Sequence, residues 1–212
     1  TYDFKALYTS IRHNQLKHSL ASTIRSAFNS RRKKFISVNR NKASLTNERK
    51  SSSFSLSIQQ LNESINYLID QSFITYKGEV FRQHIGIPMG TNCAPYMANL
   101  FLHTYETKFV DQLVNTNHSH TAKLIANMLR YQDDCIIFND GDSFGNHWKE
   151  IYPLEMQLEQ TSRNNTCTFL DLAINIENGS FSYKSYDKRK DFNFEIINYP
   201  DQGNVPQSPS YG

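Results

Sequence analysis

A pair of adjacent aspartates between two short apolar segments constrains this chain more than any other feature. Asp133 and Asp134 lie between the apolar segments 129–131 and 135–138. Two short strands joined by such a polar link predict a hairpin with the carboxylates at its tip. Because an unpaired carboxylate is costly to bury, we expect the pair to contact water or cations. Magnesium prefers hard oxygen ligands, so the tip is a candidate metal site, although an ordinary acidic turn would have the same sequence.

The composition is that of a globular protein. The chain has 212 residues, of which 38% are hydrophobic and 20% charged, and this excludes a disordered tail. No apolar run approaches the ~20 residues that a membrane span needs, so we expect neither a span nor a signal peptide. Cys93, Cys135 and Cys167 form no Cys-x-x-Cys pair, which disfavours a disulfide scaffold and a zinc ribbon and indicates a reducing compartment.

The net charge of +3 conceals an asymmetry along the chain. Residues 1–50 contain 12 Lys and Arg and two acidic residues, a net charge of +10, whereas residues 51–212 have a net charge of −7. The basic segment predicts a polyanionic partner. A solvated helix face or a localisation signal would explain the same charge.

The hydrophobic pattern predicts an α+β chain in which hairpins and helices alternate. The polar stretch 37–54 is expected to be a loop, and Ser57 with Gln60 resembles a helix capping box. Helices are expected at 14–36, from Ser57 onward, at about 92–114 with Pro95 in the first turn, and at 148–159. Strands are expected at 1–4, 73–76, 80–83, 129–131, 135–138, 168–176 and 180–186.

Two further motifs carry chemistry. Asp3 ends an apolar strand and precedes the aromatic Tyr8 by five residues, although an Asp at this position could simply cap the next helix. Gly86-Ile87-Pro88-Met89-Gly90 precedes a predicted helix. Its glycines permit close approach of the backbone to a ligand, and the helix offers free N–H groups; a tight turn is the plainer interpretation.

In this order, the motifs resemble those of reverse transcriptases over nearly the whole chain. The segment from Asp3 to Tyr8 resembles motif A of that family, Gly86 to Pro95 resembles motif B, and Tyr131 to Asp134 resembles motif C. Phe169-Leu170-Asp171-Leu172 resembles the hairpin that grips the primer end. The resemblance implies a polymerase palm, an antiparallel sheet packed on helices, with part of the fingers in residues 1–198. Residues 199–212 would be an irregular start of a connection or thumb segment.

Within the motifs, the residues are most similar to those of Penelope-like retroelements. The similarity lies in Ile85–Pro95, Ala98–Leu102, Leu7–Ile11 and Thr168–Asp171. It implies an RNA-directed DNA polymerase of a retrotransposon, in the nucleus rather than the cytoplasm. Because the N-terminal fingers and most of the thumb are absent, we expect activity in a parent protein and none in this segment alone. An RNA-dependent RNA polymerase, or a decayed or domesticated element that binds RNA without catalysis, remains an alternative.

The resemblance also implies a role for each site residue. Two magnesium ions, or manganese in their place, would be held by the catalytic carboxylates of Asp3 and Asp133, with Asp134 in support. Tyr8 would exclude the 2′-hydroxyl of a ribonucleotide, and the partners would be an RNA template, a DNA primer and deoxynucleotides. The other nucleotide-binding residues would be Phe4, Lys5, Ala6, Leu7, Met89 and Gly90. The residues in contact with primer or template would be Tyr131, Gln132, Phe169, Leu170, Arg31, Arg32, Lys33 and Lys34.

Overall fold

The computed structural model describes residues 1–40, 42–49, 53–139 and 141–191. Contacts within the chain define two compact units, Thr1–Thr161 and Ser162–Gly212, and each is described by itself. The predicted irregular segment 199–212 and its boundary at residue 198 lie outside the described residues, so that division of the chain stays a prediction. In the part of the chain that is described, no helix is long and apolar enough to cross a membrane.

A four-stranded antiparallel sheet is the centre of the first unit, in the order β7-β8-β1-β9. Its strands are β1 (Tyr2–Lys5), β7 (Leu129–Tyr131), β8 (Asp134–Ile136) and β9 (Gln157–Gln160). Residues of β1 alternate between the two faces of the sheet. Tyr2 and Phe4 are buried in the core, whereas Asp3 and Lys5 lie on the more exposed face. The alternation therefore places the candidate carboxylate of Asp3 on the less buried face of the sheet.

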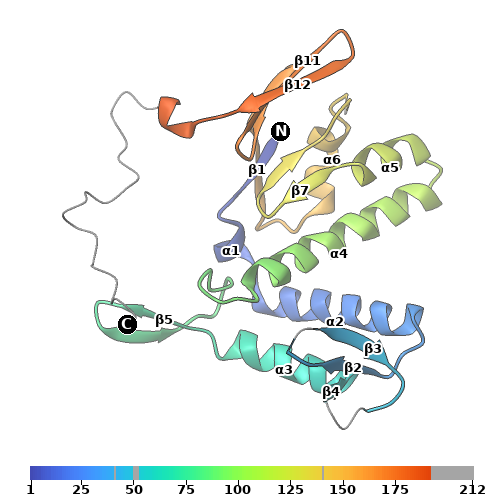
Figure 1. Ribbon diagram of the computed structural model, residues 1–212, viewed down its shortest axis with the longest axis vertical. Coiled ribbons are helices and arrows are strands. Elements are labelled where there is room, and N and C mark those ends of the chain that lie inside the picture. Colours follow the sequence, from blue (N-terminus) through green and yellow to red (C-terminus); the bar gives the residue numbers. More distant parts are fainter. Residues whose placement is uncertain (41, 50–52, 140, 192–212) are drawn as a thin grey trace, which may run out of the picture. The chain divides into compact units, whose positions relative to one another are not determined.

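Helices pack against the sheet and against one another (Figure 1). They are α1 (Leu7–Ser10), α2 (His13–Ser30), α3 (Ile58–Asp70), α4 (Ala94–Asn115), α5 (Ser119–Ala126) and α6 (Ser143–Ile151). The long helix α4 contributes Phe101 and Leu102, both fully buried, to the core, and Pro95 lies in its first turn as predicted. Helix α2 contacts both α3 and α4. The expected α+β class, with an antiparallel sheet packed on helices, is confirmed.

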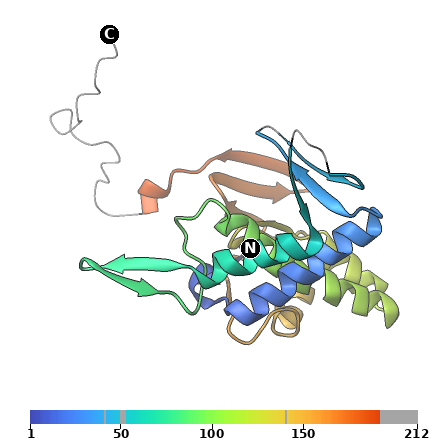
Figure 2. The ribbon, with the colours of Figure 1, turned by 90° about the horizontal axis from the view of Figure 1, so that it is seen from below.

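The predicted capping box and hairpin around α3 are confirmed. The Ser57 side chain accepts a hydrogen bond from the Gln60 backbone N–H, and the Gln60 side chain accepts one from the Ser57 N–H. After α3, strands β5 (Phe73–Tyr76) and β6 (Glu79–Arg82) pair in the predicted hairpin. Figures 1 and 2 both show this hairpin extending away from the helices, and every residue of its two strands is exposed.

The predicted helix 14–36 and loop 37–54 are wrong in part. Helix α2 ends at Ser30, and the chain then forms β2 (Phe35–Val38), β3 (Ala43–Thr46) and β4 (Phe54–Ser57). These strands pair in a sheet of order β3-β2-β4. Along β3 and β4, apolar and hydroxyl side chains alternate with a period of two, which is a strand pattern, whereas β2 has the adjacent apolar residues Phe35 and Ile36. The abundance of serine suggested a loop, but serine does not prevent a backbone from pairing in a sheet.

The predicted helix 148–159 is also wrong in part. Helix α6 ends at Ile151, Pro153 follows, and Gln157–Gln160 forms β9. Proline lacks the N–H that a helix interior needs, so the helix cannot continue through it. Pairing with β1 then gives the backbone of β9 its hydrogen-bond partners. The short helices α1 and α5 were not predicted.

The second unit is built on a three-stranded antiparallel sheet, β10-β11-β12, followed by the 3₁₀ turn η1. Their bounds are β10 (Thr166–Phe169), β11 (Leu172–Glu177), β12 (Ser180–Ser185) and η1 (Lys188–Asp191). The predicted hairpin around Asn178 and Gly179 is confirmed. The expected continuous strand 168–176 is wrong, because a turn at Leu170 and Asp171 divides it and Leu170 has a positive φ of 54°.

Candidate active site

The central sheet brings the carboxylates of Asp3 and Asp134 together and places the backbone of Asp133 beside them. Asp3 on β1 lies directly opposite Asp134 on β8. Asp133 precedes Asp134 in the two-residue turn between β7 and β8, and its carbonyl accepts a hydrogen bond of 2.9 Å from the Phe4 backbone N–H. Directly opposed residues in an antiparallel pair point to the same face. Asp3 and Asp134, about 130 residues apart in the sequence, thus lie on the same face of the two central strands of the sheet.

A fourth carboxylate and a lysine lie beside Asp3. Glu159 on β9 is opposite Asp3 on its other side. The Lys5 ammonium is 2.6 Å from Glu159 Oε2 and 3.7 Å from Asp3 Oδ2. The hydrogen bond and the charge of Glu159, followed by Asp3, raise the pKa of Lys5 above its ordinary value. Lys5 therefore stays cationic and balances part of the negative charge of Asp3 and Glu159.

Glu159 was not among the predicted site residues, because residues 148–159 were predicted to form a helix. The signal was the alternation in Gln157-Leu158-Glu159-Gln160, in which only Leu158 is buried. Such alternation predicts a strand with one face in the core and the other in solvent.

Tyr8 lies against the turn that carries Asp133. Its hydroxyl donates a hydrogen bond of 3.3 Å to Gln132 Oε1. Partial burial, followed by the negative charge of Asp133, raises the pKa of Tyr8, so its hydroxyl remains protonated. Gln132 has a positive φ of 54°, which turns the chain tightly between the two strands. The structure thus brings together the aromatic residue and the acidic pair that the sequence singled out separately.

The glycine loop is docked on the short helix α1, which contains Tyr8. The Ile87 N–H donates to the Tyr8 carbonyl at 2.7 Å, and the Gly86 N–H donates to the Ile11 carbonyl at 2.7 Å. A Cβ atom at Gly86 would lie 2.7 Å from the Tyr8 carbonyl oxygen, and Gly86 has a φ of +87°. Only glycine fits this close approach without strain. Further along the loop, Met89 is 69% exposed, and no atom lies within 4 Å of a Cβ built at Gly90.

A buried ion pair joins the carboxylate turn to α4. The Arg130 guanidinium donates to both carboxylate oxygens of Glu106, at 2.8 and 3.2 Å, and to Asn99 Oδ1 at 2.6 Å. The side chains of Arg130 and Glu106 are only 9% and 14% exposed. The Tyr152 hydroxyl donates to Glu106 at 2.9 Å, and its ring packs edge-on against Phe4 in β1. The network connects β7, α4 and β1 beneath the candidate site.

The network of Arg130, Glu106 and Tyr152 was not predicted from the sequence either. The signal was Glu106, which lies on the buried stripe of α4, four residues after Leu102 and three before Phe109. An acidic side chain on an apolar stripe needs a buried partner, and Arg130 in the short apolar strand before Tyr131 is the matching cation.

Within the first unit, the predicted primer and template residues form two separate groups. Tyr131 and Gln132 lie at the carboxylate turn, and Tyr131 is 57% exposed. Residues 31–34 follow α2, an 18-residue helix that is about 27 Å long at 1.5 Å per residue. The first turn of α2 lies at the glycine loop, where His13 Nε2 is 2.8 Å from the Gly86 carbonyl. The basic run is therefore at the far end of that helix from the candidate site.

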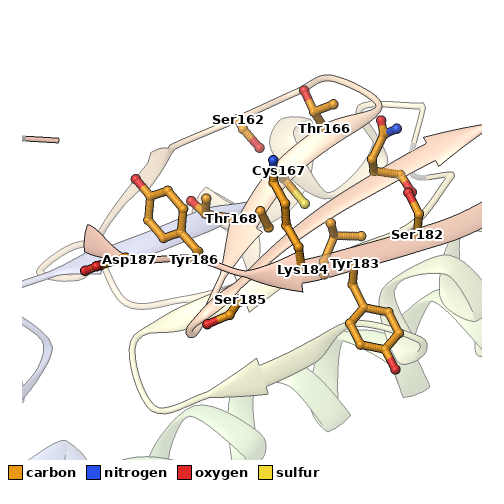
Figure 3. Close-up of a pocket in the computed structure, with 13 residues that line it drawn as sticks. Ser162, Thr166, Cys167, Thr168, Ser182, Tyr183, Lys184, Ser185, Tyr186 and Asp187 are labelled. Carbon is orange, nitrogen blue, oxygen red and sulfur yellow. The ribbon is translucent and has the colours of Figure 1, made fainter. Parts of the chain in front are cut away.

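Phe169 and Leu170 belong to the second unit, at the turn between β10 and β11, where Phe169 pairs with Leu172. The same sheet has a shallow pocket of about 900 Å³ (Figure 3). Hydroxyl side chains and Lys184 dominate its lining, as the labels of Ser162, Thr166, Thr168 and Ser182 indicate.

Comparison with known proteins decides the fold. No protein-family model matches the chain, and no curated protein matches it. The solved structure of telomerase from Candida albicans in complex with the TWJ fragment of telomeric RNA matches with a TM-score of 0.53 and 15% identity, over 87% of this chain and 31% of that chain. The fold is reverse-transcriptase-like.

A second solved structure gives a similar match. Apo telomerase from Candida tropicalis, truncated from its C-terminal domain, matches with a TM-score of 0.49 and 17% identity, over 86% of this chain and 34% of that chain. The chain thus spans about a third of the length of these telomerase chains.

Among residues 1–40, 42–49, 53–139 and 141–191, no group of three or more His, Cys, Asp or Glu side chains is arranged to hold a metal ion by itself.

Cys135 provides a test of how tightly the carboxylate hairpin is packed. It follows Asp134 and is fully buried, and this burial raises the pKa of its thiol to about 12. Since the thiolate is the reactive form, we expect Cys135 to resist iodoacetamide at pH 8 in the folded chain, while the half-buried Cys93 and Cys167 react. Mass spectrometry of the alkylated peptides would measure this. Labelling of all three at equal rates would show that the hairpin opens readily.

Proposed function

We propose that this chain carries the catalytic centre of an RNA-directed DNA polymerase, a reverse transcriptase, with Asp3, Asp133 and Asp134 as its carboxylates. The observation that carries the proposal is the pairing of Asp3 with Asp134 on the less buried face of the sheet, with Asp133 in the adjoining turn. The reverse-transcriptase-like fold supports the same function.

The carboxylates fit divalent magnesium. Magnesium is usually bound by one or two carboxylates together with waters and substrate phosphates, rather than by a cage of protein ligands. Asp3 and Asp133 would be such a pair, with Asp134 in support. When bound with the substrate, the two ions would activate the primer 3′-hydroxyl and neutralise the leaving pyrophosphate.

The other residues would position the substrates. Backbone N–H groups of residues 5–7 and the ammonium of Lys5 would contact the triphosphate, because Lys5 already lies beside Asp3. Tyr8, held by Gln132, would lie under the sugar and exclude a 2′-hydroxyl. Met89 and Gly90, in the open part of the glycine loop, would flank the nascent base pair. Positioning and charge compensation would supply most of the catalysis, as in other phosphoryl transfers.

Within this function, we propose a Penelope-like retroelement as the source of the polymerase and an RNA template with a DNA primer as its partners. The subfamily proposal rests on the residues of the segments Ile85–Pro95 and Leu7–Ile11. Phe169 and Leu170 would contact the primer strand, in keeping with their position at a tight turn.

Primer extension tests the proposal directly. The assay uses a longer protein that contains this chain, an RNA template, a DNA primer, deoxynucleotides and magnesium. Asp133→Asn removes one negative charge without changing the shape of the side chain, and we expect extension to fall at least 1000-fold, since several kcal/mol of charge stabilisation would be lost. Binding of Mn²⁺ to the 212-residue chain, followed by electron paramagnetic resonance, should weaken in parallel.

The matched control is Asp111→Asn on α4, which removes the same charge from an exposed position. It should leave both extension and Mn²⁺ binding unchanged. Equal extension by Asp133→Asn and the unmodified protein would refute the mechanism. RNA binding without any extension, in the unmodified protein, would favour the alternative of a domesticated element that binds RNA without catalysis.

Tyr8 is expected to determine the choice of sugar. Tyr8→Ala should reduce discrimination against ribonucleotides by about 10- to 100-fold, because the ring that blocks the 2′-hydroxyl is removed. Tyr8→Phe keeps the ring and loses only the hydrogen bond to Gln132, so it should discriminate nearly as well as the unmodified protein. Kinetics of single-nucleotide incorporation would compare the two. Ready use of ribonucleotides by the unmodified protein would indicate an RNA polymerase instead.

A further inference from the structure

Basic side chains gather on the small sheet β3-β2-β4 and the connections around it. We call its described residues, 31–40, 42–49 and 53–57, the basic sheet. Within these ranges Glu48 is the one acidic residue. The seven cations are Arg31, Arg32, Lys33, Lys34, Arg40, Lys42 and Arg49.

Strand register divides these cations between two ends of the sheet. Phe35 pairs with Thr46, so the run 31–34 and Arg49 lie at the same end. Val38 pairs with Ala43, so Arg40 and Lys42 lie at the opposite end, in the turn between β2 and β3. A four-residue strand is about 13 Å long at 3.3 Å per residue. That length corresponds to about four base-pair steps of 3.4 Å, so the two groups can face separate phosphates of one strand.

The cations are available to a ligand. All seven except the half-buried Lys33 are exposed. None of them forms an ion pair with another described residue; the Arg49 guanidinium donates a hydrogen bond of 3.2 Å to Gln60 Oε1 and lies 5.2 Å from the centre of the Phe35 ring. Seven cations held so close together repel one another, and a polyanion would relieve that repulsion.

We propose that the basic sheet binds the sugar-phosphate backbone of nucleic acid at a site separate from the carboxylates. Helix α2 runs from the glycine loop to the basic sheet (Figure 1), and its length of about 27 Å corresponds to about eight base-pair steps. The proposal rests on the polymerase function proposed above for the identity of the nucleic acid, which is the hybrid of RNA template and DNA primer.

The composition of the basic sheet favours phosphate over other anions. Four of its seven cations are arginines, whose planar forks match phosphate oxygens in two hydrogen bonds at once. Contacts of this kind carry no sequence information, which suits a polymerase that must accept any template.

Fluorescence anisotropy of the 212-residue chain with a labelled RNA–DNA hybrid, between 50 and 200 mM salt, tests this site. The variant Arg40→Gln/Lys42→Gln/Arg49→Gln removes three cations and leaves the run 31–34 intact. Each phosphate contact contributes about 0.7 to 0.9 to the slope of log K against log salt, so the slope should fall by about 2 to 3. Affinity at 50 mM salt should fall at least tenfold.

The matched control, Lys108→Gln/Lys123→Gln/Lys149→Gln, removes the same charge from exposed positions on α4, α5 and α6. It should bind the hybrid nearly as well as the unmodified chain. An equal loss in both variants would overturn the proposal, because net charge alone would then explain binding. Equal affinity of the unmodified chain for poly-glutamate would also overturn it, since the surface would then be a site for acidic protein segments.

Arg49 contacts Phe35 and donates to Gln60 on α3, so its replacement could disturb the sheet. The variant Arg40→Gln/Lys42→Gln avoids this, and its slope should fall by about 1.5. Mn²⁺ binding in the same variants separates this inference from the function proposed above. If the chain binds the hybrid through the basic sheet but binds no Mn²⁺, the inference stands and the metal site is refuted. If the chain binds Mn²⁺ but the variants bind the hybrid as tightly as the unmodified chain, the metal site stands and the inference is refuted.

Discussion

Replacing Arg130 with methionine is expected to destabilise the chain by about 3–5 kcal/mol, because the substitution leaves the Glu106 carboxylate buried without its cation. Arg130 lies in β7 and Glu106 in α4, so the change should also loosen the attachment of the carboxylate turn. Urea unfolding followed by circular dichroism would give the free energy of unfolding. Mn²⁺ affinity measured well below the unfolding midpoint would report on the turn itself.

Two controls interpret the Arg130 result. Arg130→Met/Glu106→Leu removes both charges, and it should recover much of the lost stability, since replacing a buried ion pair by apolar groups is often nearly neutral. Lys17→Met breaks the more exposed pair of Lys17 and Asp70, whose atoms are 2.7 Å apart, and should change the unfolding midpoint little. If Arg130→Met were no more destabilising than Lys17→Met, the buried network would not be holding α4 to the sheet.

The second large effect is expected at Gly86. In Gly86→Ala the new Cβ would lie 2.7 Å from the Tyr8 carbonyl oxygen and 2.9 Å from Thr9 Cα, and both are backbone atoms that cannot move aside. The φ of +87° adds the strain of a left-handed conformation for alanine. Together the steric clash and the backbone strain should cost about 2–5 kcal/mol of folding free energy and displace helix α1, which contains Tyr8.

Substitutions at two other glycines distinguish the steric clash of the new Cβ from the strain of the positive φ. Gly78 has a φ of +83° with open space around its Cβ position, so Gly78→Ala should cost only the conformational strain of about 1–2 kcal/mol. Gly90 has neither a positive φ nor a neighbour within 4 Å, so Gly90→Ala should change stability by no more than about 0.5 kcal/mol. Equal losses in Gly86→Ala and Gly78→Ala would show that the glycine loop does not dock on Tyr8 as closely as described.

Local sequence patterns predicted the structure correctly wherever residues close in the sequence determine it. The capping box of Ser57 and Gln60, the hairpin around Gly78 and the first turn of α4 at Pro95 are confirmed because each depends on side chains or dihedral angles within a few residues. The same reasoning failed for β2 and β9. β9 is four residues long and pairs with β1 some 155 residues away, so its partner cannot be recognised from neighbouring residues. β2 pairs with the nearby β3, but its Phe35-Ile36-Ser37-Val38 lacks the strict alternation of a half-buried strand.

The sequence by itself determined the α+β class and singled out Asp3, Tyr8, Asp133 and Asp134, since charge, spacing and turn residues can be recognised without knowing the partners. Only the tertiary structure placed Asp3 opposite Asp134 and Glu159. It also showed the hydrogen bond from Tyr8 to Gln132 and the ion pair of Arg130 with Glu106. The physical reason is that strand register and the pairing of buried charges are set by free energies of long-range contacts. Such contacts leave no periodic pattern in the sequence.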